Sequence, residues 1–232
     1  MLRVREQLDA QRRFIANAAH QLKTPLALLA TQAAFAQRAG AEQDREEALA
    51  ALQANTMKTA RLVSQLLVLS RAEPQSSGQR SGGVDMAETA RAVLDDFAST
   101  ALKSSIELSF EECGRPAIVS GDGILLREMM VNLVDNALRY TPAGGTVTVS
   151  VAVEDGLCRL VIVDDGPGIP ADERSRVFER FYRSSNSSVD GSGLGLAIVR
   201  EIVETAGGSV TLEDGIDGRG LSVEVRLPIT VV

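Results

Sequence analysis

The clearest constraint on the fold is the helical spacing of apolar residues in the first third of the chain. One series follows a seven-residue repeat with two alternate positions: Leu8, Ile15, Ala18, Leu22, Pro25 and Leu29. A second series steps by four and three residues: Ala48, Leu52, Asn55, Thr59, Leu62, Leu66 and Leu69. This spacing puts one narrow apolar seam on each of two helices. The segment AGAEQDRE at 39–46 then predicts the connecting loop, with Gly40 as the helix breaker.

Two long helices joined by a loop predict an antiparallel hairpin. A helix of about 35 residues is roughly 50 Å long, and one hairpin cannot cover both seams along that length. Two hairpins can do so as a four-helix bundle, which predicts a homodimer. The alternative is a hairpin that packs on its own C-terminal domain, and we favour the dimer.

The chain changes character after PQSSGQRSGG at 74–83, which predicts a linker between two domains. We expect a helical hairpin over 1–73 and an α/β sandwich domain over 84–232, so the fold class is α+β. Helices are predicted at 84–102, 122–140 and 194–206, with Asp122 as an N-cap. Strands are predicted at 106–110, 117–120, 146–153, 159–163, 209–212 and 221–227, the third and fourth as a hairpin around 154–156.

Composition excludes several classes of function. The net charge is -7, aromatic residues make up 3% of the chain and Trp is absent, which argues against nucleic-acid binding. Cys113, Cys158 and a single His do not form a zinc site, so both thiols are expected to be reduced. The sequence has no apolar run of about 18 residues and its start is charged, so it predicts neither a membrane span nor a signal peptide.

The segment FIANAAHQLKTPL at 14–26 carries the first candidate site. His20 is the only histidine, and its seam neighbours Ala18 and Leu22 turn it away from the helix core into water. Thr24 lies four residues later on the same face. Pro25 lacks an N–H and crowds the preceding turn, which costs roughly 3 kcal/mol in an ordinary helix. His20 alone would be taken as a surface residue, but the combination predicts a functional histidine.

Four motifs of the second domain suggest a ligand site. In REMMVNLVDNALRY, residues Glu128, Asn132 and Asn136 share one helical face, although a solvated polar face would look similar. In VDDGPGI, Asp164 ends an apolar strand and can accept a hydrogen bond from an exocyclic amine, although the segment is also a good turn.

The other two motifs point to an anion. RVFERFYRS at 176–184 either packs its Phe residues or brings Arg183 to a phosphate. GSGLGLAIV at 191–199 leaves free N–H groups at a helix start. It is not a Rossmann fingerprint, because no strand ends directly before it, and it lacks the GKS or GKT of a Walker A motif.

The segment AHQLKTPL resembles the H-box of two-component sensor histidine kinases. The resemblance implies that His20 is the nucleophile and that Thr24 positions water when the enzyme dephosphorylates its partner. This chain has Gln21 where the family usually has Glu or Asp. An amide can orient the imidazole but is not a base, so we expect slower self-phosphorylation than with a carboxylate.

Taken in chain order, the four motifs resemble the N, G1, F and G2 boxes of the Bergerat-type ATP-binding fold, and we use these names for them below. The resemblance implies bound ATP and Mg²⁺, with Asp164 on the adenine amino group and Asn136 and Asn132 on the metal. Glu128 is implied as a catalytic group beside the metal. Further nucleotide-binding residues implied are Arg139, Tyr140, Gly166, Gly168, Ile169, Arg183, Gly191, Gly193, Leu194, Gly195 and Leu196. The segment 171–191 is expected to form a mobile lid.

The resemblance thus implies a kinase core that phosphorylates His20 and passes the phosphoryl group to an Asp of a response regulator. It also implies a cytoplasmic portion of a membrane-anchored sensor. The alternatives are a protein that is mainly a regulator phosphatase and a scaffold that binds nucleotide without catalysis. Topoisomerases and chaperone ATPases share the nucleotide fold but lack the phosphoacceptor hairpin.

Overall fold

The computed structural model describes residues 2–38, 40–71, 82–112, 115–183 and 192–230. The chain separates into two compact units, Met1–Val68 and Leu69–Val232. The predicted linker at 74–83 lies outside the described residues except for Gly82 and Gly83, which begin the first strand. Each unit is therefore described by itself.

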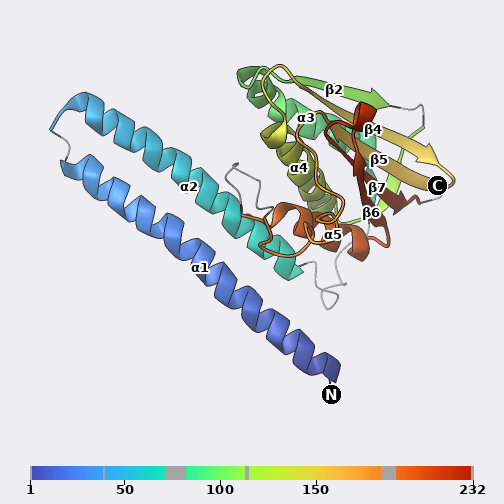
Figure 1. The fold of residues 1–232 in the computed structure, drawn as a ribbon, viewed down its shortest axis with the longest axis horizontal. Helices are drawn as coiled ribbons and strands as arrows, with labels where there is room; N and C mark the ends of the chain where they lie inside the picture. The colour runs from blue at the N-terminus through green and yellow to red at the C-terminus, as the bar shows by residue number, and fades with distance from the viewer. Residues whose placement is uncertain (1, 39, 72–81, 113–114, 184–191, 231–232) are drawn as a thin grey trace. The chain divides into compact units, whose positions relative to one another are not determined.

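The first unit is an antiparallel hairpin of helices α1, Leu2–Arg38, and α2, Glu42–Arg71 (Figure 1). The predicted loop at 39–46 is too long, because α2 already begins at Glu42. Glu42 and Asp44 lie in its first turn, where negative charge suits the positive end of the helix dipole. The polar residues that suggest a loop in the sequence form the start of a helix in the structure.

The hairpin has the predicted seam on α2, where Ala48 and Leu62 are buried. A polar pair interrupts it. Asn55 Nδ2 donates a hydrogen bond of 3.0 Å to Gln32 Oε1 of α1. Helix α1 continues through Pro25, so the proline does not end the helix.

The second unit contains a five-stranded sheet in the order β2-β4-β5-β7-β6. Its strands are β2 Glu107–Glu112, β4 Thr146–Glu154, β5 Leu157–Asp164, β6 Ser209–Asp214 and β7 Leu221–Pro228. The β2–β4 pair is parallel and the other pairs are antiparallel. A second, two-stranded sheet pairs β1, Gly82–Asp85, with β3, Ile118–Gly121.

Three helices cover one face of the large sheet: α3 Met86–Lys103, α4 Gly123–Tyr140 and α5 Gly195–Thr205 (Figure 1). Alternate strand residues face these helices and are buried, as strand periodicity requires. They include Val147, Val149, Val151, Cys158, Leu160 and Ile162. The short 3₁₀ helix η2, Ile216–Gly218, lies between β6 and β7.

Local signals set several of these boundaries. Asp122 caps α4 as predicted, since its Oδ1 accepts hydrogen bonds from the backbone N–H of Ile124 and Leu125 at 2.8 and 3.4 Å. The predicted β4–β5 hairpin also forms. Its turn residues Asp155 and Gly156 both have positive φ, as a two-residue hairpin turn requires.

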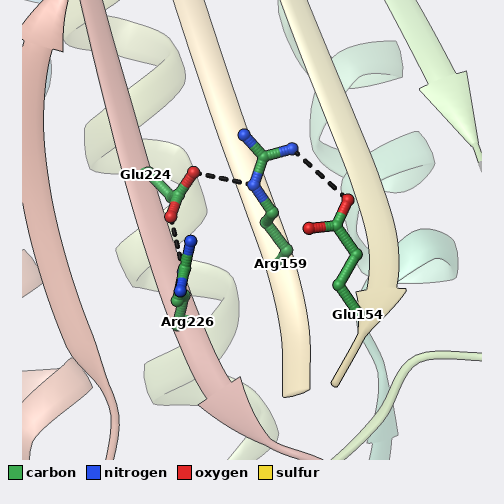
Figure 2. Close-up of polar contacts among 4 residues, drawn as sticks. All are labelled: Glu154, Arg159, Glu224 and Arg226. Atoms are coloured by element: carbon green, nitrogen blue, oxygen red, sulfur yellow. Dashed lines mark hydrogen bonds and ion pairs between the residues drawn. The ribbon is translucent and has the colours of Figure 1, made fainter. Parts of the chain in front are cut away.

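The face of the sheet away from the helices is polar. Figure 2 shows Arg159 of β5 between Glu154 and Glu224, with Arg226 on the other side of Glu224. Burial alone would raise the pKa of Glu224, but hydrogen bonds from Arg159 and Arg226 hold that pKa below its usual value. Long charged side chains therefore cover this face and keep it in contact with water.

The predicted free thiol of Cys158 is confirmed. It is fully buried on β5, and burial raises its pKa to about 12, with a smaller contribution from the charge of Asp85. A thiol in this environment stays protonated and unreactive. Cys113 lies outside the described residues.

Candidate active site

His20 is exposed on α1, and Thr24 is exposed one turn later. Gln21 between them is half-buried, as are Leu22 and Pro25 on the adjoining face. The imidazole is therefore open to water in the single chain, as the seam pattern predicts. An exposed histidine at this position is accessible to an incoming phosphoryl donor.

The polar face of α4 carries the predicted site residues Glu128, Asn132 and Asn136. Asn132 is only 2% exposed, and its Nδ2 donates to the carbonyl of Glu128 at 2.8 Å and to the Glu128 carboxylate at 3.1 Å. A Cβ added at Gly195 would lie 3.5 Å from Asn132 Oδ1 and 3.2 Å from Asn136 Nδ2. The amides of α4 thus meet the first residue of α5, where glycine leaves room.

Asp164, at the end of β5, is 6% exposed. Its Oδ1 accepts hydrogen bonds from the backbone N–H of Gly166 at 2.9 Å and of Leu221 at 3.3 Å. Burial raises the pKa of Asp164 to about 6; the two backbone hydrogen bonds oppose this shift and the neighbouring Asp165 charge adds to it. Both hydrogen bonds of Asp164 within the described residues go to Oδ1, which leaves Oδ2 for a ligand.

The G1 segment is held from two sides. A Cβ at Gly166 would lie 2.8 Å from the carbonyl oxygen of Tyr140, and one at Gly168 would lie 2.7 Å from that of Gly220. Gly168 has a φ of +70°, which suits glycine. The backbone therefore approaches both the end of α4 and the loop before β7 closely.

Arg174 fixes the end of the same segment. Its Nε donates to the carbonyl oxygen of Ile169 at 2.9 Å, and its Nη2 pairs with Asp214 at the end of β6. The side chain is 21% exposed, so this ion pair is partly shielded from water. Arg174 thereby ties the G1 segment to the edge of the sheet.

The F and G2 motifs meet through their backbones. The N–H of Phe181 donates to the carbonyl oxygen of Gly193 at 2.8 Å, and both residues have positive φ, +67° and +69°. Positive φ is costly for a residue with a side chain, so Phe181 is held there by its surroundings. Arg180 pairs with Glu201 of α5 at 3.1 Å. These contacts join the middle of the predicted lid to Gly193 and α5, which follow it.

Other predicted site residues lie as follows. Arg139 forms an ion pair with Asp135 at 2.8 Å, Tyr140 is 36% exposed and Arg183 is exposed. The side chain of Leu194 is fully buried in the core, and Leu196 is half-buried. The part of the predicted lid after Arg183, residues 184–191 including Gly191, lies outside the described residues.

The second unit thus brings the N, G1, F and G2 motifs together, but sequence reasoning missed four partners. These are Asp165, Arg174, Gly220 and the N–H of Leu221. The repeated Asp in VDDGPGI and the Gly pair in GRG at 218–220 were the available signals. Nothing in the local sequence marks Arg174.

The arrangement fits an adenine nucleotide. Asp164 presents a free acceptor at the base end. Helix α5 begins at Gly195 without a side-chain cap, so its first N–H groups suit phosphate oxygens. Among the described residues no cluster of three His, Cys, Asp or Glu side chains could hold a metal ion. The amide oxygens of Asn132 and Asn136 on α4 are ligands of the oxygen type that Mg²⁺ accepts.

Comparisons with known proteins agree with this interpretation. Residues 121–231 match the family of histidine kinase-, DNA gyrase B- and HSP90-like ATPases. Residues 10–75 match the His Kinase A phospho-acceptor domain. The sensor protein kinase PmrB of Pseudomonas aeruginosa is 40% identical over 98% of this chain and 48% of its own length. The chain thus spans about half the length of this curated relative.

Two solved structures are also similar. A mycobacterial sensor histidine kinase, MprB, is 36% identical with a TM-score of 0.56, covering 64% of this chain and 97% of that one. The histidine kinase ThkA, crystallised with response regulator protein TrrA, is 21% identical with a TM-score of 0.73. It covers 97% of this chain and 64% of that one, and this likeness concerns the fold alone.

The two domains and their sites define an ATP-dependent kinase with a phosphoacceptor histidine. The chain belongs to the two-component sensor histidine kinases, as a catalytic core that binds ATP. Among the described helices, none combines the length and apolar character needed to cross a membrane.

Proposed function

We propose that this chain transfers the γ-phosphoryl group of Mg-ATP to its own His20. The observation that carries the proposal is the exposed imidazole on α1 in a chain whose other unit combines the Asp164, Asn136 and Gly195 site. The phosphoacceptor family match over residues 10–75 supports the same residue, because His20 is the only histidine in the chain.

The proposed reaction is an in-line displacement. The lone pair of one imidazole nitrogen forms the N–P bond as the bond from γ-phosphorus to the bridging oxygen breaks, and ADP leaves. The proton on the other ring nitrogen passes to water. Gln21 can orient the ring but cannot take that proton, since an amide is not a base at neutral pH.

The second unit binds and orients the nucleotide. Asp164 accepts a hydrogen bond from the adenine amino group, and Gly168 lets the backbone lie along the base. The α5 N-terminus and the guanidinium groups of Arg139 and Arg183 balance phosphate charge. Mg²⁺, held through Asn136 and Asn132, would neutralise charge on the transferred group. Glu128 orients the Asn132 amide, as their hydrogen bond supports.

We further propose that the active protein is a homodimer. Seven large apolar side chains of the hairpin are 41–68% exposed in the single chain: Ile15, Leu26, Leu28, Phe35, Leu49, Met57 and Val63. A shallow hollow of about 470 Å³ also lies on α1, lined by Ala30, Thr31, Ala34, Phe35 and Arg38. Apolar surface of this extent on one unit favours burial against a second copy.

The phosphoryl acceptor proposed for His20 is an Asp of a response regulator. The fold-level likeness to ThkA, which was crystallised with a response regulator, supports this class of partner. A regulator phosphatase activity is a second candidate, because Gln21 and Thr24 leave a polar, base-free face beside His20. Loss of phosphate from a phosphorylated regulator, measured with and without Thr24→Ala, tests it.

The full-length protein is proposed to be a membrane-anchored sensor whose cytoplasmic part includes this chain. The name of the relative PmrB and the share of it that this chain spans support that view. Membrane fractionation of the full-length protein tests it.

The experiment for the main proposal is incubation with γ-labelled Mg-ATP. We expect acid-labile, base-stable label on the native chain and none on His20→Gln. Gln37→Ala, which changes an exposed polar residue of α1 outside the shallow hollow, serves as the control and should label as the native chain does. Equal labelling of His20→Gln would remove the proposal.

A further inference from the structure

A second carboxylate, that of Asp165, directly follows Asp164 and has a different partner in the protein. Its Oδ2 accepts a hydrogen bond from the N–H of Thr146 at 3.0 Å and another from the Thr146 hydroxyl at 3.2 Å. Thr146 is the first residue of β4, which pairs with β5. Asp165 therefore fastens the end of β5 to the start of its neighbour.

The same carboxylate lies against the loop that leaves α4. A Cβ at Gly145 would be 2.4 Å from Asp165 Oδ1 and 2.6 Å from the Thr141 methyl group, so any side chain there would displace them. The loop is otherwise held by backbone bonds: Thr141 N–H donates to Ala137 at 3.0 Å, and Gly145 N–H to Pro142 at 3.0 Å. Asp165 adds a side-chain link from the end of β5 to Thr146, the residue that follows this loop.

This loop shapes the surroundings of Asp164. It begins just after Tyr140, whose carbonyl oxygen lies against Gly166. Asp164 Oδ1 also accepts a hydrogen bond from the N–H of Leu221, the first residue of β7. Asp165, which follows Asp164 in the chain, thus ties the strand end that carries Asp164 to Thr146, the residue at which the loop after α4 ends.

We propose that Asp165 is a positioning residue that holds the loop after α4 and the Asp164 carboxylate at the separation an adenine nucleotide requires. The inference rests on the proposed role of Asp164 in binding the base. Asp165 itself touches no nucleotide in this scheme, because its Oδ2 is used by Thr146.

The test is calorimetric titration of the full chain with ATP and Mg²⁺ between pH 5 and pH 8. Asp165→Ala removes both hydrogen bonds and should weaken binding by about tenfold. Asp165→Asn keeps an oxygen acceptor for Thr146 and should stay within about threefold of the native chain. Thr146→Val removes only the hydroxyl bond and should weaken binding by about two- to threefold.

The pH profile tests the electrostatic coupling of Asp165 to Asp164, and the melting temperature tests simple stabilisation. Native affinity should fall as the pH drops through about 6, because Asp164 is then protonated. The Asp165 charge is among the causes that raise the pKa of Asp164, so Asp165→Asn should move this loss of affinity to lower pH. A residue that only stabilises the fold would lower the melting temperature when replaced and leave the affinity at pH 8 unchanged.

The affinities of these variants decide whether the proposed role of Asp165 stands. Unchanged affinity in Asp165→Ala, with or without a lower melting temperature, overturns the inference. The inference is also overturned if Asp165→Asn binds ATP as weakly as Asp165→Ala does. In that case the hydrogen bonds to Thr146 would not be the cause of the weaker binding. If Asp165→Ala does not fold, the Thr146→Val and Asp165→Asn results decide. Native-like binding by Asp164→Asn would instead remove the proposed role of Asp164, which is a separate failure.

Discussion

Asp164 is a residue whose carboxylate is placed to bind a ligand but whose burial destabilises the folded protein. Its carboxylate is buried at the end of β5, and burial raises its pKa to about 6 from the ordinary 3.8. The folded state therefore disfavours the ionised form that accepts the base amine. Because the folded pKa lies above the unfolded one, the stability from this group is present below pH 3.8 and is lost as pH rises through about 6.

We predict that Asp164→Asn stabilises the protein at pH 8 by about 1 to 3 kcal/mol and abolishes nucleotide binding. The amide avoids the buried charge while its oxygen still accepts from Gly166. Urea denaturation at fixed protein concentration measures the gain, which should shrink towards pH 4. The exposed Asp172→Asn is the matched control. A gain that is the same at pH 4 and pH 8 would contradict burial of the ionised carboxylate as its cause.

Gln21 is the residue at which the phosphoacceptor helix departs from the family. We predict that Gln21→Glu increases the initial rate of acid-labile labelling from ATP by about tenfold, because a carboxylate can take the imidazole proton. Gln21→Leu, which neither orients nor deprotonates the ring, should label more slowly than the native chain. Equal rates for the native chain and Gln21→Glu would show that proton removal does not limit the reaction.

Among the elements, the hairpin is held in register by a polar pair as well as by its seam. The Asn55–Gln32 hydrogen bond joins α2 to α1 at a half-buried level, and the Thr59 hydroxyl donates to the Asn55 carbonyl at 2.7 Å. A polar pair in a helical core specifies alignment, because a shifted register leaves both amides unpaired. That alignment also sets which part of α2 lies beside His20.

We predict that Asn55→Leu lowers stability by about 1 kcal/mol, since Gln32 then loses its partner. The double change Asn55→Leu with Gln32→Leu should recover that loss or exceed the native stability, since two apolar residues pack in place of the pair. Denaturation at fixed concentration completes the double-mutant cycle. The exposed Gln53→Leu on α2 is the control, and additive effects of the two changes would argue against a direct pair.

At the scale of the whole molecule, the acceptor histidine and the nucleotide site belong to different compact units. In the proposed reaction the nucleotide bound to one unit must reach His20 of the other, so we expect transfer to depend on the chain segment that joins the two units. The second unit has its own core and both of its sheets, which allows it to be studied alone.

We predict that residues 82–232 alone bind ATP with the affinity of the full chain but acquire no acid-labile label. Addition of residues 1–73 should restore labelling, on the hairpin fragment, at a slower concentration-dependent rate because the tether is gone. Asp164→Asn in the larger fragment is the control and should give no label. Label on the 82–232 fragment by itself would contradict the assignment of His20.

Much of this fold could be predicted from the sequence, because the determining signals are local or periodic. The seam of α2, the cap at Asp122, the turn at Asp155 and the alternation along β4 each depend on residues close in the chain. The exposure of His20 follows from the same helical period. Hydrophobic spacing and capping chemistry act over one or two turns, so the sequence alone determined them.

Tertiary structure alone decided how the site is held together. The Asp165–Thr146 bond joins residues 19 apart, Arg174–Asp214 joins residues 40 apart and Asp164–Leu221 joins residues 57 apart. No period or short motif relates such partners, since only the packing of the sheet strands β4, β5, β6 and β7 brings them within hydrogen-bonding distance. The raised pKa of Asp164 arises in the same way, because burial depends on the whole domain rather than on neighbouring residues.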